Sequence, residues 1–165
     1  MPTWRRKCIL LIVGIVLLGC ARLPMLGQAM IFRGGVPLQE ALSQGELTVL
    51  ALGALHVGIP PEVVTRTLLV SRSPILPQRP PPRGFTWHTH IHLHAVVDRL
   101  PGCERLGVIL HELVHRWQWD RGDLSPAAYA GEALGQMVNH DDTNRFERQA
   151  YAAQDMFMAR CREVR

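Results

Sequence analysis

The segment with the clearest potential for chemistry is His111-Glu112-Leu113-Val114-His115. On an α-helix, residues four apart share a face, so His111 and His115 can direct two imidazole nitrogens at one point. Zinc binds neutral imidazole nitrogens at about 2.0–2.1 Å, and this spacing suits it. Glu112 would lie beside such an ion rather than on it, where its carboxylate can act as a general base toward water. The segment therefore predicts a catalytic zinc site on a helix.

The residues around this motif predict the helix that it needs. Apolar side chains recur at three- and four-residue spacing between Leu106 and Trp119, which is the pattern of an amphipathic helix. Pro101-Gly102 predicts a turn before the helix, and the polar run from Asp120 to Asp123 predicts its end. An ordinary core helix with two enclosed histidines is the alternative. A buried glutamate between two histidines is costly without a partner cation, which favours the metal site.

A catalytic zinc site usually has three protein ligands and one open position, so a third ligand must lie elsewhere in the chain. The extended motif of metzincins would place glycine at 118 and histidine at 121, and the chain has Gln118 and Arg121 instead. That subgroup is excluded. The residue types downstream leave five candidates: Glu132, His140, Asp141, Asp142 and Glu147.

Two stretches resemble gluzincins, the zinc metallopeptidases in which a glutamate on a downstream helix completes an H-E-x-x-H site. The run from His111 to Gln118 is similar to H-E-x-x-H-x-x-Gln, and the run from Asn144 to Tyr151 is similar to Asn-x-Phe-Glu-x-x-Ala-Tyr of compact bacterial members. The resemblance covers about residues 85–157 and implies that Glu147 is the third ligand of one Zn²⁺ ion. The Asn-Glu-x-x-Ser-Asp stretch of thermolysin-like gluzincins is absent, and Glu132 remains the main rival.

Apolar periodicity and turn residues predict the elements that would position these side chains. We expect a helix from Pro37 to about Val57, opened by proline in its first turn and ended by Pro60-Pro61. Val63 to Ser71 is rich in valine, threonine and leucine, which predicts a strand. The proline-rich stretch from Ser73 to Gly84 predicts a stiff loop that joins no sheet.

Residues Phe85 to Val97 alternate as in a strand, with apolar side chains on one face and four histidines on the other: His88, His90, His92 and His94. Alternate residues on one face lie about 7 Å apart, so neighbouring histidines could chelate an ion only with some distortion. Two interpretations stay open. The histidines are spectators or substrate contacts along a strand that lines the substrate cleft, or they form an accessory metal site.

After the motif helix, Ser125-Pro126 predicts an N-cap and a first-turn proline, opening a helix from Ala127 to about Val138. A polar turn follows, and then a final helix from Arg145 to Arg162 that carries Glu147. With the resemblance, these elements imply an α+β fold. It is a zincin-like mini-domain whose short mixed or antiparallel sheet packs on the H-E-x-x-H helix and on a C-terminal helix with the third ligand.

The N-terminus predicts export. Arg5 to Lys7 form a positive region, and Cys8 to Leu18 form an apolar run too short for the about twenty residues that span a bilayer. The run ends in Leu17-Leu18-Gly19-Cys20, which resembles the lipobox of bacterial lipoproteins and implies cleavage before Cys20 and acylation of that cysteine. Because Ala21 and not aspartate follows Cys20, the resemblance implies that the lipoprotein is anchored on the periplasmic side of the outer membrane. An uncleaved N-terminal anchor is the alternative.

This interpretation divides the chain into a signal peptide at 1–19, a lipid-anchored tether at 20–36 and a peptidase domain at 37–165. Removing Arg5, Arg6 and Lys7 from the 18 basic residues leaves 15 against 14 acidic ones. The mature chain would be nearly neutral, so its charge does not predict nucleic-acid binding. Outside the cytoplasm, the remaining pair Cys103 and Cys161 is a disulfide candidate, with two free thiols as the alternative.

The predicted function is that of a zinc metallopeptidase that hydrolyses peptide bonds in the cell envelope, with Glu112 as its base. A second donor must stabilise the developing oxyanion, and Tyr151, Tyr129 or the strand histidines could do so. Two other functions stay open. One is a catalytically silent zincin-like lipoprotein that serves as a binding or assembly module, and the other is a histidine-rich metal-handling lipoprotein.

Overall fold

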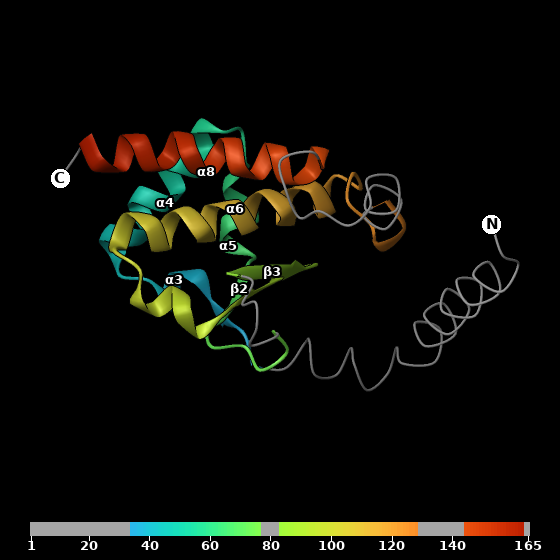
Figure 1. The fold of residues 1–165 in the computed structure, drawn as a ribbon, viewed down its shortest axis with the longest axis horizontal. Coiled ribbons are helices and arrows are strands. Elements are labelled where there is room, and N and C mark those ends of the chain that lie inside the picture. The colour runs from blue at the N-terminus through green and yellow to red at the C-terminus, as the bar shows by residue number, and fades with distance from the viewer. Residues whose placement is uncertain (1–33, 77–82, 129–143, 164–165) are drawn as a thin grey trace, which may run out of the picture. The chain divides into compact units, whose positions relative to one another are not determined.

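The computed structural model describes residues 34–76, 83–128 and 144–163, which form an α+β fold with a four-stranded mixed sheet. The long helix α6 (Gly102–Asp120) lies between helix α8 (Arg145–Glu163) and the sheet (Figure 1). Among the described residues, no helix has both the length and the apolar character needed to cross a membrane. The α+β class is confirmed.

Helix α6 is the centre of the fold, and it confirms the helix predicted around the motif. Its apolar side chains Ile109, Leu110 and Leu113 are fully buried, and His111, Glu112 and His115 are buried with them. The helix follows Pro101 and ends before Gly122, whose φ of 75° is a left-handed conformation that glycine adopts without strain. Burial on most of its sides follows from its place between α8 and the sheet.

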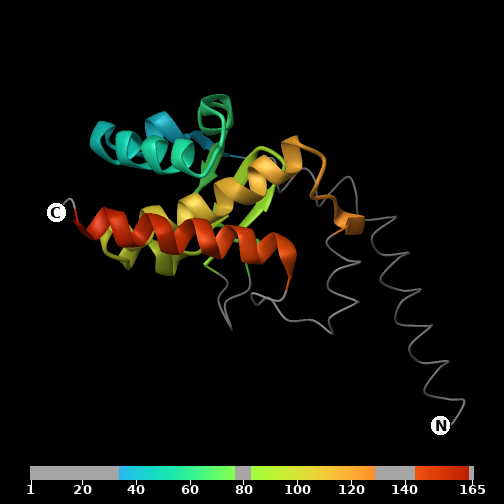
Figure 2. The same ribbon diagram turned by 90° about the horizontal axis from the view of Figure 1, so that it is seen from above.

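Helices α6 and α8 run side by side in both views (Figures 1 and 2). A Cβ on Gly107 of α6 would lie 2.9 Å from the sulfur of Met158 on α8, so a larger residue there would require the Met158 side chain to move. A disulfide between Cys103 and Cys161, with Cα atoms 5.8 Å apart, joins the start of α6 to the end of α8. The two helices are therefore antiparallel and held in a fixed register.

The sheet has the strand order β1-β2-β4-β3. Strand β4 (His90–Leu93) pairs with β3 (Gly84–Trp87) in antiparallel fashion and with β2 (Leu68–Val70) in parallel fashion. Strand β1 (Val36–Pro37) pairs with β2 in antiparallel fashion. Strand β3 is thus an edge of the sheet, and it contacts α6.

The prediction of one continuous strand from Phe85 to Val97 is wrong. The chain reverses at His88 and Thr89, where His88 takes a left-handed φ of 49°, and Trp87 pairs with His90 across the turn. A 3₁₀ helix, η1 (Ala95–Arg99), follows β4. The turn was not predicted because the alternation of apolar residues and histidines continues through it, and no glycine, proline or asparagine marks it.

The turn also changes which residues share a face. Residues opposite each other in an antiparallel pair point to the same side, so Phe85 lies with His92, and Thr86 lies with the buried Ile91. Thr86 contacts Glu112 of α6. The histidines of β4 therefore share a face with Phe85 and Trp87, and the α6-facing side is the one that carries Thr86.

The helix predicted from Pro37 to Val57 is two helices, α3 (Leu38–Ala41) and α4 (Gln44–His56). Ser43 separates them and caps α4. Its Oγ accepts from the Glu46 backbone N–H at 3.3 Å, and the Glu46 carboxylate accepts from the Ser43 N–H at 2.9 Å. This reciprocal cap favours a new helix start at Ser43 over continuation of α3.

The strand predicted from Val63 to Ser71 is wrong in its first half, which forms helix α5 (Pro61–Thr65), and only Leu68–Val70 form a strand. Pro61 occupies the first helical turn, where proline loses no hydrogen bond. The Pro60-Pro61 pair therefore starts a helix as well as ending the previous one.

Downstream, α8 confirms the final helix, and Ser125 caps the predicted preceding helix by accepting from the Ala128 N–H at 3.1 Å. Several predictions lie outside the described residues. They are the signal peptide and Cys20, most of the helix at 127–138, and the side chains of Tyr129, Glu132, His140, Asp141 and Asp142.

Candidate metal centre

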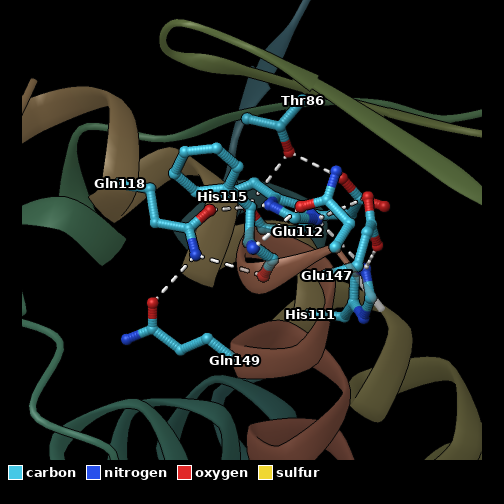
Figure 3. Close-up of polar contacts among 9 residues, drawn as sticks. Thr86, His111, Glu112, His115, Gln118, Glu147 and Gln149 are labelled. Atoms are coloured by element: carbon cyan, nitrogen blue, oxygen red, sulfur yellow. Dashed lines mark hydrogen bonds and ion pairs between the residues drawn. The ribbon is translucent and has the colours of Figure 1, made fainter. Parts of the chain in front are cut away.

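Three buried side chains from α6 and α8 converge on one point: His111, His115 and Glu147 (Figure 3). His111 Nε2 lies 3.2 Å from His115 Nε2 and 3.2 Å from Glu147 Oε2. His115 Nε2 lies 3.5 Å from Glu147 Oε1. The helical period explains the arrangement, because residues 111 and 115 share the face of α6 that meets the first turn of α8.

The distances fit a tetrahedral ion. Ligands at about 2.0–2.1 Å from zinc lie about 3.3 Å from one another in a tetrahedron. The separations of 3.2, 3.2 and 3.5 Å are close to that value. Two imidazoles and one carboxylate are also a donor set that zinc accepts at catalytic sites. This buried group could hold a metal ion.

The electrostatics of the group favour positive charge at its centre. Burial alone would raise the pKa of Glu147, but hydrogen bonds from His111 and His115 outweigh it and hold that pKa well below its usual range. Burial lowers the pKa of His115, yet the hydrogen bond to Glu147 and the nearby charge of Glu112 raise it overall. Both shifts depend in part on the Glu147 carboxylate facing two imidazoles, and a cation at that point would satisfy all three side chains.

Gln118 fixes which nitrogen of His115 faces the centre. The Gln118 amide N–H₂ donates to the backbone carbonyl of Phe146 at 3.2 Å and to Gln149 Oε1 at 2.9 Å. Its oxygen must therefore face His115 Nδ1, at 2.8 Å, and that nitrogen must be the donor. A neutral His115 then carries its lone pair on Nε2, the atom that faces Glu147. Because Phe146 and Gln149 belong to α8, Gln118 also links the two ligand-bearing helices.

His111 is placed differently. Its Nδ1 is buried and has no hydrogen-bond partner among the described residues. The ring of Tyr151, one turn after Glu147 on α8, meets the His111 ring edge-on at 4.7 Å between centroids. Tyr151 is therefore next to the centre, as its spacing from Glu147 predicts, and its side chain is partly exposed.

Glu112 lies beside the ligands and not among them. Its carboxylate is buried and accepts a hydrogen bond from Thr86 Oγ1 of β3 at 2.7 Å (Figure 3). The Thr86 oxygen is also 3.0 Å from the Glu112 backbone carbonyl. This is the position that a general base needs, close to the centre without occupying a ligand position.

The histidines of the β3–β4 hairpin do not join this centre. His92 Nδ1 lies 2.9 Å from Ser73 Oγ, and His94 Nδ1 accepts from the Val96 N–H at 3.1 Å. His90 is buried, which lowers its pKa, and lies in an interior strand whose two edges are both paired. His88 is in the turn and stacks near Trp119. Strand β4 therefore cannot offer an edge to a substrate; among the described strands the edges of the sheet are β1 and β3, and β3 is the one that contacts Glu112.

No accessory metal group forms among these histidines within the described part of the chain. There, His111, His115 and Glu147 are the one group of three potential ligands close enough to share an ion. Two contacts were missed from the sequence: that of Thr86 with Glu112 and that of Gln118 with His115. Gln118 had a signal in its spacing, since it lies three residues after His115 on a helix. Thr86 had none, because its direction depends on the hidden turn at His88.

Comparison with protein-family models, with curated proteins and with solved structures finds no match to this chain. The site is therefore interpreted from its own geometry.

Proposed function

We propose that this protein is a zinc-dependent peptidase with a zincin-like active site. The observation that carries the proposal is the convergence of His111, His115 and Glu147 at tetrahedral spacing, with Glu112 buried beside them. A site that only stabilises the fold has no need of an additional carboxylate at that place. The buried Glu112 therefore favours catalysis over a structural role for the ion.

His111 and His115 would hold zinc through Nε2, and Glu147 through its carboxylate. A bound zinc ion supplies a Lewis acid and a water of lowered pKa. The Glu112 carboxylate would accept a proton from the attacking water and deliver it to the leaving amine. Tyr151, whose ring lies 4.7 Å from that of His111, would donate its phenol hydrogen to the developing oxyanion.

The sheet offers a place for an extended substrate. Strand β3 is an edge strand, and Thr86 in the middle of it contacts Glu112. A peptide that pairs with this edge would run past the metal centre. Strand addition relies on backbone hydrogen bonds, so we expect cleavage of unfolded polypeptides in preference to compact ones.

Two measurements on the full chain test the proposal. Elemental analysis is expected to find one zinc per chain, with zinc lost or weakened in Glu147→Ala. The control Asp155→Ala removes an exposed carboxylate of the same helix and should keep the metal. Cleavage of fluorescein-labelled casein is expected for the wild type and not for Glu112→Gln. Absence of zinc from the wild type, or cleavage that survives Glu112→Gln, would show the proposal to be wrong.

We further propose that the protein is tethered to the bacterial cell envelope through acylated Cys20. The support is the positive region, the short apolar run and the lipobox-like Leu17-Leu18-Gly19-Cys20. Growth with radiolabelled palmitate should label the wild-type chain and leave Cys20→Ser unlabelled. Equal labelling of both chains would contradict the assignment.

A further inference from the structure

Strand β3 contacts both oxygens of the Glu112 carboxylate. Thr86 Oγ1 donates to Oε2 at 2.7 Å, a short distance typical of a hydroxyl bound to a charged carboxylate. Thr86 is the hydrogen-bond donor to this carboxylate among the described residues, and both side chains are buried. Loss of the hydroxyl would leave a buried carboxylate oxygen without that partner.

Gly84 contacts the other oxygen. A Cβ built on Gly84 would lie 2.5 Å from Glu112 Oε1 and 2.8 Å from its Cδ, so the carboxylate fills the space that a side chain would need. Residues 84 and 86 alternate along β3 and face the same side. The backbone of Gly84 and the hydroxyl of Thr86 together form a seat for the carboxylate.

We propose that Thr86 and Gly84 are positioning residues that hold Glu112 in the orientation of a working base. The inference rests on the proposed peptidase function and adds residues that act through Glu112. Among the contacts of the described residues, neither Thr86 nor Gly84 touches the three candidate metal ligands. The seat would therefore affect the orientation of Glu112 and leave metal binding unchanged. The metal and the base are thus held by different elements, the metal by the α6–α8 pair and the base by β3.

The seat also links substrate binding to catalysis. The only free edge of the described sheet at this site is that of β3, whose other edge pairs with β4. A peptide bound along that edge would therefore pair with β3 (Gly84–Trp87), the strand that carries Gly84 and Thr86. Pairing would restrict the motion of β3 and, through Thr86, that of Glu112.

The test uses the full chain, loaded with zinc, and casein as substrate. Thr86→Val keeps the shape of the side chain and removes its hydroxyl. We expect one zinc per chain, a KM within about threefold of the wild type, and a kcat lowered about 10–100-fold, which is part of the about 10²–10⁴-fold that a positioned general base contributes. Thr86→Ser, which restores the hydroxyl, should recover most of the kcat. Thr89→Val, on the same hairpin, controls for loss of a threonine hydroxyl away from Glu112.

Two further experiments separate positioning from general stability. Gly84→Ala should lower kcat with zinc retained, whereas Gly45→Ala, where a Cβ meets nothing within 4 Å, should not. A direct readout is the crystal structure of zinc-loaded Thr86→Val, in which the carboxylate of Glu112 should leave its place beside Gly84.

The outcomes distinguish this inference from the proposed function. A wild type that cleaves, with Glu112→Gln inactive and Thr86→Val as fast as the wild type, overturns the seat and leaves the peptidase proposal intact. No recovery of kcat with Thr86→Ser also overturns it. A wild type that binds no zinc or cleaves nothing overturns the proposed function, and the inference with it.

Discussion

Replacing Gln118 by leucine tests how the His115 imidazole is held in the candidate metal centre. In Gln118→Leu, His115 Nδ1 loses its 2.8 Å acceptor, and the Phe146 carbonyl loses its 3.2 Å donor. The first loss frees the imidazole to change tautomer and orientation. The second removes a tie between α6 and α8.

The size of the effect follows from those contacts. Loss of a hydrogen-bond partner of a metal-ligating histidine lowers metal affinity by about 10–100-fold, or about 1.4–2.7 kcal/mol. Gln118 is 1% exposed, so water does not replace the lost partner readily. The zinc-free protein should be destabilised as well, by about 1–3 kcal/mol for an unsatisfied buried polar group.

Zinc affinity is measured by competition with a chromophoric chelator, and stability by urea unfolding of the zinc-free chain. Gln118→Glu keeps an acceptor for His115 Nδ1 and should retain more affinity than Gln118→Leu. Gln149→Ala removes only the exposed end of the network and should bind zinc within about threefold of the wild type. The argument for tautomer control is refuted if Gln118→Leu binds zinc as tightly as the wild type.

The disulfide and the α4 cap give two further predictions. Replacing Cys103 and Cys161 by alanine should lower the free energy of unfolding by about 4 kcal/mol in the chain-entropy model, given a separation of 58 residues; unchanged urea midpoints would contradict this. The pKa of Glu46 is lowered, first by the Ser43 backbone N–H, then by the Ser43 hydroxyl and by Arg105, while burial acts in the opposite direction. The Glu46 carboxylate therefore contributes fully to stability above pH 4.5, and this contribution is lost as the pH falls through its folded-state pKa. Urea unfolding should therefore find Glu46→Gln less stable than the wild type at pH 7, by under about 1 kcal/mol because the group is partly exposed. The difference should shrink as the pH falls through the folded-state pKa of Glu46, and a difference that does not shrink in acid would contradict this.

The parts of the site that were predictable from the sequence are those fixed by a single helix. The spacing of His111 and His115 determines their common face wherever the helix lies, and the apolar pattern around them predicts that helix. Glu147 was predicted from a resemblance, and the structure brings it to the two histidines from another element. The number of residues between Glu147 and the two histidines does not indicate how close their side chains lie in the folded chain.

The parts that were not predictable depend on a turn or on tertiary packing. A strand shifted by one residue reverses the face of every side chain, and the turn at His88 changes the register of everything before it. Thr86 therefore had no assigned direction in the sequence. The break at Ser43, by contrast, has a visible signal, because serine followed by glutamate three residues later is a capping box.

The two helices that carry the candidate metal ligands are joined by more than the chain between them. Cys103 and Cys161 close one end of the pair, and His115 and Glu147 meet near the other. A single proteolytic cut between α6 and α8 would therefore leave two fragments that still travel together on a non-reducing gel and separate on a reducing one.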